Sequence, residues 1–288
     1  MQVFDSTIKE TLTERLNALE RHFDADVVFY YGEIHTFIAK PFRDFIEQLR
    51  EDPAHEHLVM FINTPGGSAE TVEKLVEIIR FHYQNVSFVV PDYAMSAGTI
   101  LCMSGDRILM DYSSSLGPID PQVFNGKEWV PALGYLDKVE QMVEKSRLGT
   151  LSNAEFVILQ SLDLAQLSRY EQARDLTITL LKRWLVDYKF KDWMHHETDA
   201  TLKGQPVTTE QKRVRAEEIA KLLGDNKLWH SHGRFIGPAT LERVLRLRID
   251  DYSKTPDRRK LIRAYNDLLV EYISRSQLKH FMHSRRYF

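Results

Sequence analysis

Residues 58–68 read Leu58-Val59-Met60-Phe61-Ile62-Asn63-Thr64-Pro65-Gly66-Gly67-Ser68, an apolar run that ends in a double-glycine turn. A short apolar run that is bounded by turn residues predicts a buried strand. Residues 69–83 follow with apolar side chains at every third or fourth position, which predicts a helix. A second apolar run, 86–90, leads to a small-residue segment, 96–102, that predicts another helix. This part of the chain therefore predicts two consecutive strand–helix units.

The same alternation continues on both sides of these units. Apolar or periodic segments predict a helix, a strand, a helix and a further strand at 5–22, 27–31, 40–50 and 107–110. Alternating strands and helices favour an α/β fold with parallel pairing, and continuous apolar strands predict helices on both faces of the sheet. From about residue 135 the pattern is mostly helical, and its last helix is expected over 257–283. We expect three parts: an N-terminal helix (1–26), an α/β domain that is mostly helical after about 135 (27–250), and a C-terminal amphipathic helix (251–288).

The composition is that of an ordinary globular protein, with 43% hydrophobic and 27% charged residues. The formal net charge of −3 argues against a nucleic acid as partner. The single cysteine, Cys102, cannot form an internal disulfide and lies in an apolar run, so we interpret it as a buried core residue. The N-terminus lacks a secretory signal and no apolar run is long enough to span a bilayer. We expect a soluble, cytoplasmic protein.

Two features that carry chemistry lie one strand–helix unit apart. The glycines Gly66 and Gly67 let the backbone approach a ligand closely, with N–H groups that can bind an oxyanion. Ser96 stands at the next strand-to-helix junction, where Ala97 and other small neighbours leave its hydroxyl open. Parallel neighbouring strands bring both loops to the same carboxyl edge of the sheet. We predict Ser96 as a nucleophile, with oxyanion donors at Gly66, Gly67 and Ala97.

These segments resemble a known group of peptidases. Asn63-Thr64-Pro65-Gly66-Gly67 resembles the Asn-Ser-Pro-Gly-Gly signature of the Clp proteases and signal peptide peptidases, and residues 93–99 resemble their nucleophile segment. Residues 115–122 and 231–234 are similar to the serine dehydrogenase proteinase family within that group. The resemblance covers roughly 27–250. It implies a Clp/crotonase-type fold of repeated βαβ units, peptidase activity and frequent oligomerisation.

A serine hydroxyl needs a neighbouring base to become nucleophilic at neutral pH. Clp proteases use a histidine, but Asp120 stands roughly at the corresponding place, and we interpret it as structural. Peptidases with a Ser–Lys dyad place the lysine several tens of residues after the serine, which points to Lys138 or Lys145. Lys138 has more apolar neighbours and is the predicted base, because a lysine can act as a base only when burial lowers its pKa. His232, in a turn-rich segment, is the rival.

The predicted function is therefore that of a serine peptidase with a Ser96–Lys138 dyad. Two alternatives stay open: a catalytically silent assembly or binding protein that keeps the fold, and an acyl-coenzyme A hydrolase or isomerase of crotonase type. No cofactor and no metal site are expected. No Walker motif is present, so an ATP-driven unfoldase would be a separate chain.

The predicted partners are a peptide or protein substrate and further copies of the chain. The tail 257–288 contains eight Lys or Arg and three Asp or Glu, which would suit a peripheral contact with a membrane surface. The alternative is that the tail is a packed amphipathic helix with a charged outer face.

Overall fold

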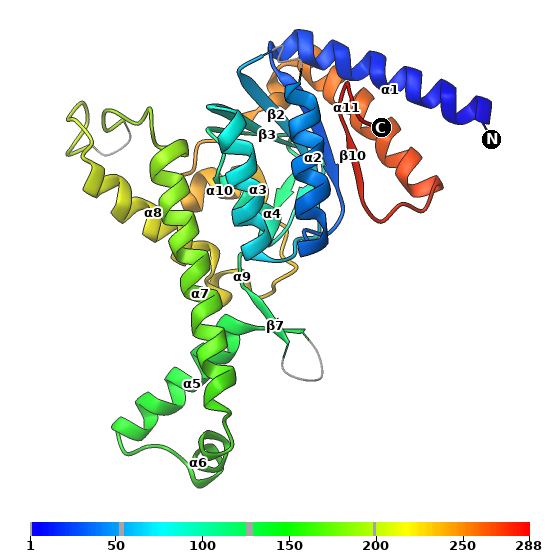
Figure 1. Ribbon diagram of the computed structural model, residues 1–288. Helices are drawn as coiled ribbons and strands as arrows, with labels where there is room; N and C mark the ends of the chain where they lie inside the picture. The colour runs from blue at the N-terminus through cyan, green and yellow to red at the C-terminus, as the bar shows by residue number, and fades with distance from the viewer. Residues whose placement is uncertain (1, 52–54, 125–128, 198–199) are drawn as a thin grey trace.

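The computed structural model describes residues 2–51, 55–124, 129–197 and 200–288. Its centre is a six-stranded sheet with the order β10-β1-β2-β3-β5-β9 (Figure 1). Neighbouring strands are parallel except for β10, which runs antiparallel to β1. The strands are β1 (Asp26–Tyr31), β2 (His57–Asn63), β3 (Asn85–Val90), β5 (Arg107–Met110), β9 (Asp250–Asp251) and β10 (Phe281–His283). The predicted α/β fold with parallel pairing is confirmed.

Helices cover both faces of the sheet, as the continuous apolar strands predict. Val28 and Tyr30 of β1 belong to one hydrophobic cluster, whereas Val27 and Phe29 belong to a second one on the opposite face. The first cluster includes side chains of α2 (Ala39–Arg50), α3 (Ala69–His82), α4 (Ala97–Met103), α7 (Leu164–Trp184), α8 (Thr209–Leu223) and α10 (Pro238–Leu245). The second includes side chains of α1 (Gln2–Phe23) and α11 (Pro256–Arg275), which pack along one another.

An arm extends away from the sheet (Figure 1). It consists of α5 (Ala132–Arg147), α6 (Asn153–Gln160) and the N-terminal part of α7, whose other end reaches the core. The antiparallel pair β7 (Gln122–Phe124) and β8 (Trp129–Pro131) leads into α5, and the short helix α9 (Asn226–Trp229) follows α8. Among the helices of the described residues, none combines the length and the apolar character that a membrane crossing requires.

The prediction of a helix over 257–283 is wrong at its C-terminal end. Helix α11 stops at Arg275, Gln277 adopts a φ of 54°, and the chain returns as β10 along the edge of β1. The apolar spacing continues past the helix because Phe281 packs against Tyr272 and Phe288. The open edge of β1 offers backbone partners that a longer helix would leave unused, and sequence periodicity cannot indicate this.

Candidate active site

Ser96 occupies a sharp turn between β4 (Tyr93–Ala94) and α4. Its backbone has φ 51° and ψ −115°, a region that side chains other than glycine seldom adopt. Enzymes of the α/β-hydrolase fold present their serine nucleophile on a similarly strained strand-to-helix turn. Ser96 is 9% exposed, and within the described part of the chain its hydroxyl makes no hydrogen bond. The hydroxyl is therefore free to engage a substrate and a base.

A short ladder of backbone hydrogen bonds holds this turn against the loop that follows β2. Thr64 N–H donates to Tyr93 O at 3.1 Å, and Met95 N–H donates to Thr64 O at 3.0 Å. On its other side β4 pairs in parallel with β6 (Ser115–Leu116). The two loops that carry chemistry in the sequence are therefore adjacent at the carboxyl edge of the sheet, as predicted.

Gly66 lies directly against the nucleophile turn, and Gly67 lies against the backbone of Ile34. Their φ angles are 117° and 143°, which glycine adopts without steric cost. A Cβ atom on Gly66 would lie 2.8 Å from Ser96 Cβ, and one on Gly67 would lie 2.1 Å from Ile34 O. The close approach of the nucleophile turn therefore requires glycine at 66, and the close approach of the Ile34 backbone requires glycine at 67.

The N–H groups around Ser96 differ in their availability. Gly66 N–H already donates to Thr64 Oγ1 at 3.1 Å. Those of Gly67 and Ala97 have no hydrogen-bond acceptor among the residues that the structure covers. Two backbone donors, one in the glycine loop and one directly after Ser96, thus lack an acceptor among the described residues, and donors of this kind can bind a developing oxyanion.

The segment from 115 to 122 is tied to the nucleophile helix. The buried Thr99 hydroxyl donates to Ala94 O at 2.8 Å and accepts from Gly117 N–H at 2.9 Å. Asp120, three residues further on, is fully buried. Its carboxylate accepts from Leu133 N–H at 3.0 Å and, with the Asn226 amide oriented to satisfy both of its groups, from Asn226 Nδ2 at 2.9 Å.

Asp120 therefore connects the start of α5 with the start of α9. Burial raises the pKa of its carboxyl to about 6, while the two hydrogen bonds act in the opposite direction. These contacts agree with the structural role that we expect for Asp120. A cavity of about 280 Å³ lies beside it, lined in part by Ile119, Pro121 and Leu133. Ser96 is not among the residues that line this cavity.

The structure does not bring Lys138 to the Ser96 hydroxyl. Lys138 is exposed on α5, where it lines a cavity of about 330 Å³ on the arm together with Met142. Lys145, the other lysine of this helix, forms an ion pair with Glu155 at 2.5 Å.

His232 lies in a segment beside β6. Ile236, four residues further on, exchanges two backbone hydrogen bonds with Leu116, at 2.8 and 3.0 Å. The imidazole is half-buried, and its Nδ1 atom is buried with no hydrogen-bond partner among the described residues. Burial lowers the pKa of His232, which keeps the ring neutral and able to accept a proton.

The family profile of ClpP-like, SDH-type serine proteinases matches residues 21–220, well over half of the chain. The chain belongs to this family. The match confirms the resemblance found in the sequence and agrees with the Clp-like α/β architecture. It also favours a proteinase over the crotonase-type and non-catalytic alternatives. Ser96, Gly66 and Gly67 of this SDH-type proteinase all lie within the matched region.

Two curated relatives come from Methanocaldococcus jannaschii. The uncharacterized protein MJ0137 is 29% identical over 156 residues, which is 50% of this chain and 53% of that protein. The uncharacterized protein MJ1495 is 29% identical over 103 residues, which is 35% of each chain. The chain thus spans about half the length of the first relative and about a third of the second.

Two solved structures are similar to the chain at a low level. One is a serine-to-alanine variant of the 1510-N membrane-bound stomatin-specific protease, with a TM-score of 0.45, 13% identity and 81% coverage of both chains. The other is a lysine-to-alanine variant of the same protease with a substrate peptide. Its TM-score is 0.32 at 23% identity, over 39% of this chain and 54% of that chain. At these scores neither structure bears on the site.

Proposed function

We propose that this SDH-type proteinase hydrolyses peptide bonds with Ser96 as its nucleophile. The observation that supports this most directly is the strained turn at Ser96, packed against Gly66, with N–H groups at Gly67 and Ala97 that have no acceptor among the described residues. A serine that served only to begin a helix would accept a hydrogen bond from that helix, and Ser96 makes none. Membership of a serine proteinase family supports a peptide substrate.

The proposed reaction begins with attack of Ser96 Oγ on the substrate carbonyl carbon. The hydroxyl proton passes to a base, and the carbonyl oxygen becomes an oxyanion that accepts from the N–H groups of Gly67 and Ala97. One such donor contributes about 3 kcal/mol to the transition state. The base returns the proton to the leaving amine, and water then hydrolyses the acyl-enzyme. Gly66 N–H could join the oxyanion hole only by exchanging its bond to Thr64 Oγ1.

Lys138 is our proposed base. Because its ammonium is exposed on the arm, a Ser96–Lys138 dyad requires the bound substrate, or a neighbouring copy of the chain, to bury the lysine and bring it to Ser96. His232 is the second candidate. It is favoured by its half-buried ring, on a segment beside β6, whose Nδ1 atom has no partner in the part of the chain that the structure describes. In either case the base accepts one proton and returns it within one acylation step.

The nucleophile is tested with a fluorophosphonate that labels reactive serines. Ser96→Ala is expected to abolish both labelling and peptide hydrolysis, because no other hydroxyl would occupy the strained turn. Ser146→Ala, on the exposed side of α5, is the matched control and should leave both unchanged. Undiminished labelling of Ser96→Ala would show that Ser96 is not the nucleophile, and no labelling of the wild type would favour the catalytically silent alternative.

The base is assigned from rates of acylation. Lys138→Ala should lower the rate by about 100-fold or more, the range for a general base, whereas Lys145→Ala should not change it. His232 is the base if His232→Ala, and not Lys138→Ala, lowers the acylation rate. That variant should then also lose the fall in kcat/KM at acidic pH.

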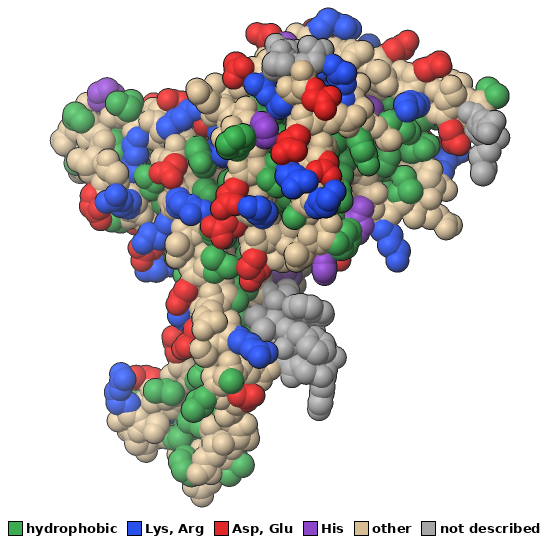
Figure 2. Space-filling view, in the orientation of Figure 1, with side chains coloured by type: hydrophobic (Ala, Val, Ile, Leu, Met, Phe, Trp, Pro, Cys, Tyr) green, Lys and Arg blue, Asp and Glu red, His purple; other side chains and the backbone are tan. Residues whose placement is uncertain are grey.

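We also propose that the chain forms a homo-oligomer through the tip of its arm. The tip carries apolar side chains that are between 46% and 75% exposed: Val143, Leu148, Phe156, Val157, Ile158 and Leu164. Figure 2 shows hydrophobic side chains gathered on this part of the molecule. We propose that a second copy of the chain covers these side chains, because large exposed apolar patches generally mark protein interfaces. The peptidases that the sequence resembles are also frequently oligomeric.

A cytoplasmic location and a peripheral membrane contact of the tail also stay proposals. Several tail cations have partners inside the molecule: Arg259 and Arg263 pair with Asp111, and Arg285 pairs with Asp26. A membrane contact would therefore use the exposed cations Lys260 and Lys279.

A further inference from the structure

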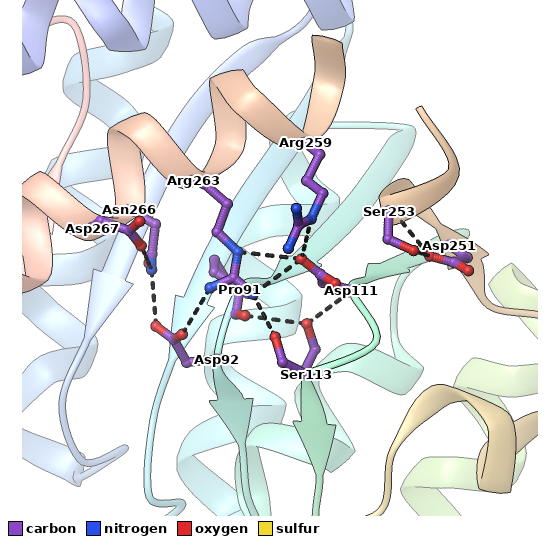
Figure 3. A network of polar contacts seen from close by, with 11 residues as sticks. Pro91, Asp92, Asp111, Ser113, Asp251, Ser253, Arg259, Arg263, Asn266 and Asp267 are labelled. Carbon is purple, nitrogen blue, oxygen red and sulfur yellow. Dashed lines mark hydrogen bonds and ion pairs between the residues drawn. The ribbon is translucent and has the colours of Figure 1, made fainter. Parts of the chain in front are cut away.

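Two carboxylates stand immediately beyond the ends of neighbouring strands. Asp111 follows the last residue of β5 and is fully buried, and Asp92 follows β3 by two residues. Arg263 of α11 lies between them (Figure 3). Its Nε and Nη2 atoms donate to Asp111 Oδ2 at 3.2 and 3.0 Å, and its Nη1 atom is 3.6 Å from Asp92 Oδ1. One guanidinium thus joins the carboxyl ends of two strands.

These contacts come from one side of α11. Arg259, Arg263 and Asn266 follow one another at spacings of four and three, so they share a helix face. Arg259 Nε donates to Asp111 Oδ2 at 2.9 Å, and Asn266 Nδ2 donates to Asp92 Oδ2 at 2.9 Å. Burial opposes ionisation of Asp111, but the hydrogen bonds from both arginines outweigh it and lower the pKa of this carboxyl. Asp111 is therefore a paired carboxylate at neutral pH.

The network continues from Asp92 to both loops of the candidate site. Asn63 Nδ2, at the end of β2, donates to Asp92 Oδ2 at 3.2 Å. Asn63 directly precedes Thr64, which forms the hydrogen bonds to Tyr93 and Met95 that hold the nucleophile turn. The Asp92 backbone carbonyl accepts from Ser115 N–H at 2.9 Å. The Asn266 side chain of α11 is therefore connected through Asp92 to Asn63, the residue directly before the glycine loop.

From these contacts we infer that Arg263 and Asn266 are positioning residues for the peptidase reaction, and that α11 holds the Ser96 turn against the Gly66–Gly67 loop through Asp92. The inference rests on the proposed function of Ser96. The strained φ of Ser96 persists only where surrounding contacts over-determine it. Asp92 lies four residues before Ser96 and accepts hydrogen bonds from both Asn63 and Asn266, so it supplies such contacts.

The test compares Asn266→Ala and Arg263→Lys with Arg275→Ala. Arg275 lies on the same helix but forms only an exposed pair with Glu271 among the described contacts, so it is the matched control. Hydrogen exchange is measured first, because it does not depend on catalysis. Both test variants should accelerate exchange of the Met95 and Gly98 amides by about tenfold, without a change in β3. Arg263→Lys keeps the charge and packs in the same space, so it remains informative if Asn266→Ala folds poorly.

The second readout is fluorophosphonate inactivation, separated into the maximal rate and the half-saturating concentration. Misplacing the nucleophile should lower the maximal rate by about tenfold, with the half-saturating concentration unchanged within about twofold. The inference is overturned if both test variants match Arg275→Ala in the exchange rate at Met95 and in the inactivation rate. A lower melting temperature of the test variants would not rescue it. If the wild type is not labelled at all, the proposed function fails, and the exchange data still decide whether α11 holds the turn.

Discussion

The backbone of Ser96 is the residue-scale feature that separates this serine from the others in the chain. A positive φ with ψ near −115° costs on the order of 1–3 kcal/mol for a residue with a Cβ atom. The fold stabilises this conformation because the Thr64 backbone forms hydrogen bonds to Tyr93 and Met95, directly before the turn. Gly66 also leaves room for Ser96 Cβ. The strained turn lies against Gly66 of the glycine loop.

Removing the Cβ atom of Ser96 should stabilise the protein while it removes the nucleophile. Ser96→Gly is expected to raise the free energy of unfolding by about 1 kcal/mol, since glycine adopts this φ without strain. Urea unfolding measures the change, and Ser104→Gly, at a position with negative φ, is the control that should lose stability. A loss of stability in Ser96→Gly equal to that of the control would show that the turn is not strained.

Asp120 should make the stability of the protein depend on pH. The folded state raises the pKa of its carboxyl to about 6, so it holds the proton more tightly than the unfolded chain does. The contribution of Asp120 to stability is therefore present below about pH 4 and is lost as the pH rises to about 6, a change of about 3 kcal/mol. Asp120→Asn should remove this dependence, measured by urea unfolding between pH 4 and pH 7. Asp175→Asn, in the exposed pair with Arg174, should keep it.

At the scale of elements, the C-terminal segment closes the edge of the sheet. Strand β10 pairs with β1, and Arg285, two residues beyond it, reaches Asp26 Oδ1 at 2.6 Å and Glu20 Oε1 at 2.9 Å. Asp26 is fully buried, and its Oδ2 atom accepts from Tyr83 OH at 2.6 Å and lies 3.8 Å from Arg50 Nη1. Arg285, from the far end of the chain, is the closer of these two cations. The tail therefore contributes an edge strand to the sheet and a cation to the ion pairs at Asp26, in addition to helix α11.

Arg285→Ala should destabilise the fold strongly, because it leaves the Asp26 carboxylate buried without this partner. The expected loss is about 3 kcal/mol in the free energy of unfolding, measured in urea. The exposed pair of Arg275 and Glu271 is the reference, and Arg275→Ala should change stability by less than about 0.5 kcal/mol. Equal effects of the two substitutions would contradict a buried charge network at the end of β1.

At the scale of the whole molecule, the chain divides its apolar side chains between a core and an exposed arm. The two clusters on the faces of the sheet are buried, whereas the tip of the arm leaves Phe156, Val157 and Leu164 between 51% and 75% exposed. Helix α7 spans both environments, which explains why its sequence lacks one clean apolar stripe.

If the arm tip joins copies of the chain, charge placed there should separate them. The double substitution Phe156→Glu with Val157→Glu is expected to reduce the molar mass found by light scattering to that of a monomer, with unchanged circular dichroism. Phe81→Glu is the control: this side chain is 86% exposed on α3, far from the tip in sequence, and should leave the mass unchanged. A wild type that is already monomeric would exclude the proposed interface.

Much of the fold follows from local pattern. The strands at 27–31, 58–62, 86–90 and 107–110, and the helices between them, appear where apolar period and turn residues predict them, because each buried element must present apolar side chains at its own repeat. The adjacency of Ser96 and the glycine loop follows as well, since parallel strands bring their carboxyl ends to one edge.

Other features depend on which distant segments meet. Apolar spacing gives no sign of the strain at Ser96, of the His232 Nδ1 atom that lacks a partner among the described residues, or of the bridge from Arg263 to Asp92 and Asp111. Strand β10 forms because β1 has an open edge, although its residues continue a helical pattern. Periodicity reports how an element buries its own side chains, whereas dihedral strain, edge pairing and ion pairs between segments far apart in sequence arise only when the chain is packed.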